Sequence, residues 1–365
     1  MRKLISDFFV NNSKIEVVGT ARNGKDAIKK IQMLQPDVVT MDVEMPEMNG
    51  LEALKEIMAV CPVPVVMLSS TTQKNAENTL IAMELGAVDF VAKPSGTISL
   101  DLHKIQDELI HKVEEATKVP IAKLKKALPR QPLATPNVAI PKAEKVRPKF
   151  VEQPTDVKHH DVTTPTTKKE WSRLTKKIVL IGTSTGGPRA LQEVITKIPK
   201  NIQAPILIVQ HMPAGFTKSL ANRLNQLSEI TVKEAEQGDI LHNGIAYIAP
   251  GGYHLKLRKV GTSFGIVLDQ TEPPRSGHRP SVDVMFEDVS QYNDFDKIAV
   301  IMTGMGYDGA AGLKQLKKTG NVMAIAESAD TCIVYGMPKA AVETQLVDEV
   351  ADVDDIAQSI MKYML

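Results

Sequence analysis

The first third of the chain alternates continuous apolar runs with a stretch in which apolar residues recur at helical spacing. The apolar runs are Val38–Met41, Val63–Leu68 and Val88–Ala92, and they have the character of strands buried on both faces. Between two of them, Leu51–Met58 repeats apolar residues every third or fourth position, which predicts a helix. Strand–helix–strand alternation predicts a parallel sheet for residues 1–115.

The same alternation returns in the second half of the chain. Apolar runs at Ile178–Ile181, Ile206–Val209 and Ile298–Met302 predict buried strands, and helical spacing is found at Ala190–Ile198 and Gly312–Lys318. The fold class is therefore predicted to be α/β, with two doubly wound parallel-sheet domains. We find no internal repeat.

Neither periodicity is present in the segment between these domains. Eight of the 22 prolines lie between Pro120 and Pro165, among Lys, Thr, Val and Ala. Such a composition buries too little apolar area to offset the entropy of ordering, so it predicts a flexible Pro/Lys-rich linker. The expected division is a first domain at 1–115, a linker at 116–174 and a second domain at 175–365.

Composition narrows the class of protein. The 365 residues carry a net charge of +1, which predicts no attraction to nucleic acid or to an anionic membrane. The two cysteines, Cys61 and Cys332, have no metal-like spacing, as is typical of a reducing compartment. No apolar run is long enough to span a bilayer, and the N-terminus has no signal-peptide core. These features predict a cytoplasmic protein without direct membrane insertion.

Three polar residues follow successive predicted strands of the first domain: Asp42, Ser69 and Lys93. The carboxyl ends of parallel strands share one sheet edge, so these side chains can converge there. A carboxylate, a hydroxyl and an ammonium suit phosphoryl transfer onto Asp42, with the other two holding the phosphoryl oxygens. Taken singly, each residue has a simpler interpretation: a turn residue, a helix cap near Asn75 and a surface lysine.

A glycine-rich loop, Gly182–Pro188, follows the first predicted strand of the second domain. Such a loop can cradle a phosphate, or it can present Ser184 as a nucleophile beside backbone N–H donors. It matches GxSxG but no nucleotide-binding pattern. An α/β-hydrolase would place several strands before this loop, so that fold is not expected here.

Two further strand ends supply a base and an acid. His211 follows the run at Ile206–Val209, and Asp308 lies in a glycine-rich loop after Ile298–Met302. Alone, His211 could be a structural hydrogen-bonding residue, and Asp308 could belong to an ordinary Asp-Gly turn. Together with Ser184 they form the constellation for acyl transfer. Their order along the chain differs from that of chymotrypsin, subtilisin and the α/β-hydrolases.

These residues lie in motifs that resemble a known family. DVEMPEMNG, with Ser69 and Lys93-Pro94, resembles the flavodoxin-type receiver domain of response regulators. IGTSTGG, QHMP, YIAPGGYHL, SGHRPSVDVMF and TGMGYDG resemble the Rossmann-like domain of the chemotaxis protein-glutamate methylesterases, the CheB family. The resemblance implies that Ser184 is the nucleophile, His211 the general base and Asp308 its orienting partner. It also implies that the Met305 backbone N–H lies at the oxyanion site, that Thr185 lies beside the nucleophile and that Asp42 is the phosphoacceptor.

The resemblance implies a function in chemotactic adaptation. The family hydrolyses glutamate methyl esters on the cytoplasmic helices of chemoreceptors, and deamidates receptor glutamines, without a cofactor in the esterase domain. Its receiver covers the esterase site until the chemotaxis histidine kinase phosphorylates it. The alternatives are a phosphorylation-controlled scaffold, a DNA-binding response regulator and a serine esterase for small molecules. The receptors, the methylation sites and the oligomeric state do not follow from the sequence.

The N-terminus departs from the receiver pattern. In the family an acidic pair at the end of the first receiver strand binds Mg²⁺, but here residues 2–9 predict a helix that contains Asp7. The metal ligands are therefore unknown. This departure argues against phosphorylation of Asp42 in this chain and favours the hypothesis that the gene product begins upstream of Met1.

The segment Ser276–Ser281 either lines a substrate groove with His278 and Arg279, or is a loop that ends in a helix cap at Ser281.

Overall fold

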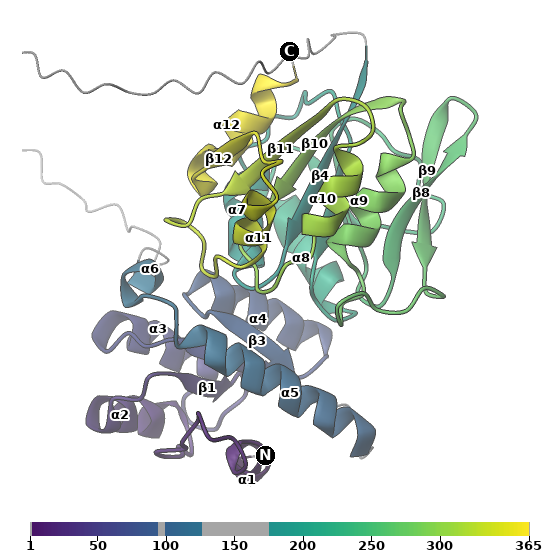
Figure 1. Cartoon of the computed structure of the whole chain (residues 1–365). Coiled ribbons are helices and arrows are strands. Elements are labelled where there is room, and N and C mark those ends of the chain that lie inside the picture. The colour runs from purple at the N-terminus through teal and green to yellow at the C-terminus, as the bar shows by residue number, and fades with distance from the viewer. Residues whose placement is uncertain (1, 94–98, 126–174, 365) are drawn as a thin grey trace, which may run out of the picture. The chain divides into compact units, whose positions relative to one another are not determined.

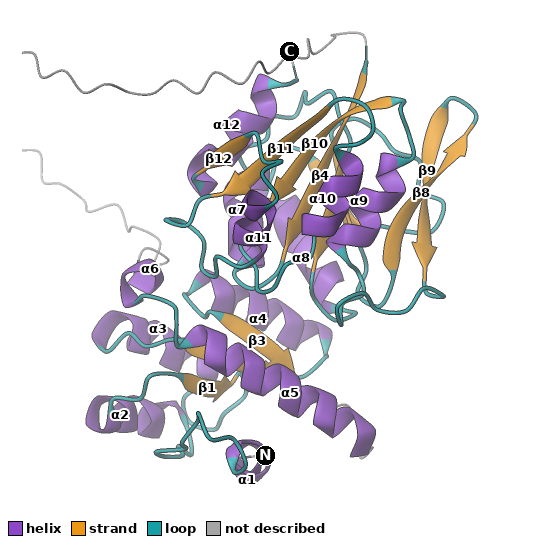
Figure 2. Ribbon diagram, in the orientation of Figure 1, coloured by secondary structure: helices purple, strands orange, loops and turns teal. Residues whose placement is uncertain are grey.

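The computed structural model describes residues 2–93, 99–125 and 175–364 (Figures 1 and 2). Pro94 and most of the predicted linker lie outside these residues. Within the described ranges, no helix has both the length and the apolar character needed to cross a membrane.

The N-terminal half contains a parallel sheet of three strands in the order β1-β2-β3. The strands are β1 (Val39–Asp42), β2 (Val65–Ser69) and β3 (Asp89–Ala92). Each begins or ends within two residues of an apolar run in the sequence, so the strand predictions are confirmed. The helices are α1 (Arg2–Phe9), α2 (Gly24–Leu34), α3 (Gly50–Val60), α4 (Gln73–Glu84), α5 (Ser99–Ala116) and α6 (Ile121–Lys125).

Local sequence explains where helix α3 starts. The side chain of Asn49 accepts hydrogen bonds from the backbone N–H groups of Leu51 and Glu52, and the Glu52 carboxylate accepts the N–H of Asn49 in return. This reciprocal capping satisfies N–H groups that lack a partner in the first turn. Helix α6 lies in the range predicted as linker, and its Leu124 is buried.

The edge of this sheet is open at β1. Residues 2–9 are helical, as the sequence predicted, and residues 15–20 belong to no strand. Strand β1 therefore pairs only with β2 within the described residues. A cavity of about 490 Å³ lies along this edge, with Phe9, Val18 and Met41 among its lining residues.

The C-terminal half contains a seven-stranded parallel sheet in the order β12-β11-β10-β4-β5-β7-β6. Its strands are β4 (Lys176–Thr183), β5 (Ile206–Gln210), β6 (Thr231–Glu234), β7 (Ile245–Ile248), β10 (Phe295–Ile301), β11 (Val322–Glu327) and β12 (Glu349–Ala351). A separate antiparallel hairpin joins β8 (His254–Val260) to β9 (Ser263–Asp269). His254 lies buried in β8, where its Nε2 atom is 3.1 Å from the Pro273 carbonyl oxygen.

Helices cover both faces of the large sheet. They are α7 (Gly187–Ile195), α8 (Phe216–Leu227), α9 (Val282–Ser290), α10 (Ala310–Leu316), α11 (Met337–Glu343) and α12 (Val353–Lys362). Val179 and Ile181 of β4 share a core with α7, α8 and α12, whereas Ile178 and Leu180 share a second core with α9, α10 and α11. Alternating residues of one strand thus enter opposite cores, and the doubly wound architecture is confirmed.

The order of the strands in the large sheet indicates where a ligand-binding or active site is expected. From β4 the chain proceeds to β5, β6 and β7 on one side, and then crosses to β10, β11 and β12 on the other. The order therefore reverses between β4 and β10. In open α/β sheets, ligands bind at the carboxyl ends of the strands at this switch point.

Candidate active site

Ser184 lies at the switch point, directly after β4. Its backbone N–H donates to the Thr303 carbonyl beyond β10 at 3.0 Å. Its carbonyl accepts from the Gly187 N–H at 2.8 Å and from the side-chain amide of Gln210, the last residue of β5, at 3.0 Å. The backbone of Ser184 is therefore held by groups from both neighbouring strands, which fixes the direction of its side chain.

Close packing of the loop after β10 against Ser184 requires glycine. A Cβ atom at Gly304 would lie 2.9 Å from the Ser184 Cβ and 2.3 Å from the Met337 Sδ. Gly186 has φ = +78°, a left-handed conformation that side chains disfavour, and it forms the start of α7. Gly186 in the loop after β4 and Gly304 in the loop after β10 thus allow these two loops to pack closely around the serine.

His211 follows the neighbouring strand β5 at the same edge. Thr183 and Gln210 are paired in the parallel register, and the His211 N–H donates to the Thr183 carbonyl at 3.2 Å. The Nε2 atom of His211 lies 2.8 Å from the Oδ2 of Asp308, and the two side chains are 4% and 2% exposed. Since Nε2 faces a carboxylate, it carries the ring proton, which leaves Nδ1 as the basic atom. Nδ1 is buried and has no hydrogen-bond partner among the described residues.

Asp308 accepts three further hydrogen bonds around its carboxylate. The hydroxyl of Ser281 donates to Oδ1 at 2.8 Å, and the backbone N–H groups of Val282 and Asp283 donate at 2.7 and 2.9 Å. These N–H groups open helix α9, whose N-terminus favours negative charge. Burial acts to raise the pKa of Asp308, but His211 and the backbone donors outweigh it and lower the pKa to about 2. The carboxylate is therefore charged at neutral pH.

A second imidazole covers the His211 ring. His278 stacks on His211, with ring centroids 3.8 Å apart and an interplanar angle of 8°. Burial and the neighbouring His211 lower the pKa of His278 to about 4, so it is neutral at pH 7. In the same segment the Ser281 hydroxyl caps α9, accepting from the Val284 N–H at 3.4 Å. The predicted cap is confirmed. The guanidinium of Arg279 contacts backbone carbonyls at 2.8 and 3.1 Å.

Thr185 directly follows Ser184, and Met305 lies in the loop after β10. Thr185 is buried, and its hydroxyl donates to the carboxylate of Asp89. Its carbonyl accepts the Thr303 hydroxyl at 2.9 Å, which links the Thr185 backbone to the loop after β10. Met305 lies half-buried in that loop, next to Gly304. Their roles as residues of the oxyanion site remain predictions.

The strand ends of the smaller sheet bring together two of the three expected side chains. The Nζ of Lys93 lies 2.6 and 2.5 Å from the two carboxylate oxygens of Asp42. The Ser69 hydroxyl instead donates to the Asn75 carbonyl at 3.2 Å. Thr72, rather than Ser69, caps helix α4. Asp42 and Lys93 converge as the sequence predicted, while the Ser69 hydroxyl is directed into the first turn of α4.

The donor set around Asp42 does not fit a Mg²⁺ ion. Within residues 2–93, 99–125 and 175–364, no group of three or more His, Cys, Asp or Glu side chains could hold a metal. The Asp42 carboxylate is neutralised by the Lys93 ammonium, whereas Mg²⁺ requires several oxygen ligands.

The arrangement defines a class of protein. A serine and a buried His–Asp pair lie at the switch point of a doubly wound sheet, as in hydrolases that form an acyl-enzyme, and a receiver-type sheet precedes them in the same chain. The chain belongs to the CheB methylesterase family. The model of that family, described as CheB methylesterase, matches residues 179–360, and the model described as response regulator receiver domain matches residues 1–103.

Relatives extend the match over the whole chain. A protein-glutamate methylesterase/protein-glutamine glutaminase of Halalkalibacterium halodurans is 54% identical over 362 residues, covering 99% of this chain and 94% of that protein. The protein of the same name in Bacillus subtilis is 49% identical over 360 residues, again covering 99% and 94%. The crystal structure of the Thermotoga maritima CheB methylesterase catalytic domain is 44% identical, with a TM-score of 0.50, and covers 52% of this chain and 99% of that structure.

Sequence reasoning missed two residues of this neighbourhood. Gln210 was noted only as part of a motif, although its amide holds the Ser184 carbonyl. Asp283 was not singled out, because an acidic residue two positions after a predicted cap is usually a complement to the helix dipole. Its actual partners come from another helix, which no local pattern reveals.

Proposed function

We propose that this protein hydrolyses glutamate methyl esters, and deamidates glutamines, on the cytoplasmic helices of chemoreceptors, with Ser184, His211 and Asp308 as its triad. The observation that carries this proposal is the buried His211–Asp308 pair on the strand ends that flank Ser184. The names of the relatives, protein-glutamate methylesterase/protein-glutamine glutaminase, support the substrate class. Because such helices are cytoplasmic, the cytoplasm is the proposed location.

The geometry supports a two-stage acyl transfer. The Ser184 Oγ attacks the ester carbonyl while His211 Nδ1 takes its proton, and Asp308 stabilises the imidazolium that forms. When the C–O bond breaks, His211 returns the proton to the leaving oxygen and methanol departs. Water then attacks the acyl-serine with the same base, releasing the glutamate carboxylate and restoring Ser184. With glutamine as substrate, ammonia leaves in place of methanol.

Backbone donors would stabilise the negative oxygen of the tetrahedral intermediate. In the proposed mechanism the Met305 N–H is one of these donors, and Thr185 lies beside the nucleophile. Each such donor contributes about 10²–10³ in rate in other serine hydrolases. The esterase step requires no cofactor in this scheme, because the nucleophile, base and donors are all groups of the chain.

A direct assay separates receptor-specific hydrolysis from general esterase activity. We expect the protein to release methanol from methylated receptor helices and ammonia from their glutamines, and to turn over a small ester such as p-nitrophenyl acetate far more slowly. Receptor-specific turnover would exclude the scaffold interpretation. Turnover of the small ester, with none of the receptor helix, would instead identify a small-molecule esterase.

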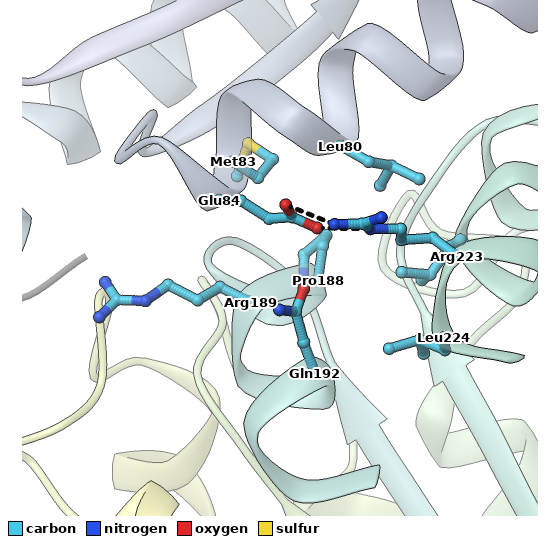
Figure 3. A pocket seen from close by; sticks show the side chains of 9 residues that line it. Leu80, Met83, Glu84, Pro188, Arg189, Gln192, Arg223 and Leu224 are labelled. Carbon is cyan, nitrogen blue, oxygen red and sulfur yellow. Dashed lines mark hydrogen bonds and ion pairs between the residues drawn. The ribbon is translucent and has the colours of Figure 1, made fainter. Parts of the chain in front are cut away.

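We further propose that the receiver restrains the esterase. Relief of this restraint by a histidine kinase would require Mg²⁺ ligands beside Asp42 that the described residues do not supply. Supporting contacts join α4, which follows the strand of Ser69, to α7 and α8 (Figure 3). The carboxylate of Glu84 accepts two hydrogen bonds from the Arg223 guanidinium, at 2.8 and 2.9 Å. Figure 3 shows these side chains directed at each other, whereas Arg189 points away. Leu80, Met83, Pro188, Gln192 and Leu224 also line this small cavity.

Removing the charge of Glu84 should raise the basal activity. A partly exposed ion pair of this kind contributes up to about 1 kcal/mol, so Glu84→Gln is expected to increase methanol release without phosphodonor by a few-fold. Glu77→Gln is the matched control, because Glu77 is an exposed residue of the same helix. Equal basal rates in the two variants would contradict a restraining role for the Glu84–Arg223 pair.

A further inference from the structure

Helices α9 and α10 pack side by side (Figure 1). A carboxylate from α9, or from the residue pair that precedes α10, covers the N-terminus of the neighbouring helix. Asp308, just before α10, accepts the N–H groups of Val282 and Asp283 at the start of α9. In return, Asp283 accepts the N–H groups of Gly309 and Gly312 at the start of α10, at 2.9 and 2.6 Å. Only one of these two carboxylates, Asp308, contacts the catalytic histidine.

Both carboxylates are deeply buried. Asp283 is 3% exposed and Asp308 is 2% exposed. Unpaired N–H groups at a buried helix start are costly, and the helix dipole favours a negative charge there. Burial, opposed by the two backbone hydrogen bonds and reinforced by the charge of Asp308, raises the pKa of Asp283 to about 6, so Asp283 is mainly ionised at pH 7.5.

The packing leaves little room for the α10 start to shift. A Cβ atom at Gly312 would lie 2.8 Å from the Asp283 Cα and 2.7 Å from the Phe286 Cβ. Gly309 has φ = +97°, which lets the chain turn sharply between Asp308 and α10. The hydrogen bond to Asp283 therefore restrains Gly309, the residue after Asp308, within the tightly packed pair of α9 and α10.

Separate hydrogen bonds hold the other end of the loop that joins β10 to α10. The Gly304 N–H donates to the Val334 carbonyl at 3.0 Å, and the Thr303 N–H donates to the buried Glu327 carboxylate at 2.8 Å. The hydrogen bonds at Gly309 and Gly312 thus hold the Asp308 side of the loop, while those at Thr303 and Gly304 hold the Ser184 side.

We propose that Asp283 is a positioning residue for the methylesterase reaction: its hydrogen bonds to Gly309 and Gly312 set the place at which Asp308 meets His211. This inference rests on the proposed function of the same site. Asp283 acts through the backbone around Asp308 and has no chemical part in acyl transfer. Misplacement of a catalytic group by about 1 Å costs about 10²-fold in rate, so the effect should be measurable.

The test compares three substitutions of Asp283 in the full-length protein. Asp283→Ala removes both hydrogen bonds, and we expect kcat for methanol release to fall by about 10- to 100-fold with KM changed less than about two-fold. Asp283→Asn should retain kcat within a few-fold, because both N–H groups bind the same Oδ1 atom, which an amide oxygen can replace. Asp283→Glu keeps the charge but displaces the carboxylate, so kcat should fall as it does for alanine.

Asp288→Ala provides the matched control. Asp288 lies on the same helix α9, but its carboxylate accepts the Leu257 N–H of the hairpin at 2.7 Å, away from the loop of Asp308. It should lose thermal stability without a comparable loss of kcat. A merely structural role of Asp283 would lower the melting temperature of Asp283→Ala and leave kcat at the level of Asp288→Ala, and this result would overturn the proposal.

The design stays decisive if Asp283→Ala does not fold. Asp283→Glu and Asp283→Asn then carry the comparison, and equal kcat values in these two variants would reject the positioning role. Wild-type protein is assayed in parallel. Absence of methanol release from the wild type would reject the proposed function itself, whereas an active wild type with an equally active Asp283→Glu would reject only this inference.

Discussion

Ser184→Ala should abolish measurable methanol release from methylated receptor helices. The substitution removes one oxygen atom, and with it the only atom that can form the acyl-enzyme in the proposed mechanism. Loss of the nucleophilic serine costs about 10⁶ in kcat in a well-studied serine protease. The fold should be unaffected, because the contacts that hold Ser184 to Thr303, Gly187 and Gln210 use its backbone.

The measurement is single-turnover methanol release, with thermal unfolding recorded on the same samples. Ser290→Ala is the control: Ser290 is also a buried serine of this half, but its hydroxyl donates to the Glu287 carbonyl at 2.7 Å on helix α9. It should keep activity close to that of the wild type. Substantial turnover by Ser184→Ala would remove Ser184 from the role of nucleophile and revive the scaffold interpretation.

Asp308→Asn should have the second largest effect, with kcat lower by about 10⁴ as for an equivalent substitution in another serine protease. An amide N–H facing His211 Nε2 would favour the tautomer with the proton on Nδ1, the atom that must accept the serine proton. Binding of the receptor helix should change little, because Asp308 is buried. An unchanged kcat would exclude Asp308 as the partner of the base.

The same variant should show a pH-dependent loss of stability. The folded pKa of Asp308 is about 2, below its ordinary value of 3.8, so the charged carboxylate stabilises the fold above pH 4 and this contribution is lost as the pH falls towards 2. A shift of this size corresponds to about 2 kcal/mol. Thermal unfolding should therefore separate wild type from Asp308→Asn widely at pH 7 and much less at pH 3. A constant difference across this range would contradict the assigned charge state.

The sequence predicted the sheet strands because their apolar runs are continuous. A strand buried on both faces has no polar alternation, so Ile178–Ile181 and Ile206–Val209 stand out from their surroundings. The proposed triad followed from the same fact, since Ser184, His211 and Asp308 directly follow such runs or lie in the loops after them. The hairpin of β8 and β9 was missed, because its strands mix charged and apolar residues.

Features that depend on contacts between distant elements could not be predicted. Local sequence does not determine which nitrogen of His211 faces Asp308, nor that the His278 ring lies against it. The direction of the Ser69 hydroxyl is another example, because it depends on where the first turn of α4 packs. In each case the partner is chosen by tertiary packing rather than by a periodic pattern.

The order in which the large sheet is wound has a consequence for protein synthesis. Strand β4 is made early, whereas β10, which lies beside it, is separated from it in the chain by β5 to β9. A nascent chain that ends before Phe295 already contains the serine and the histidine, but it lacks Asp308 and the Thr303 carbonyl that holds Ser184. In the proposed mechanism, ribosome-bound or prematurely terminated chains would therefore lack a complete triad and would be inactive.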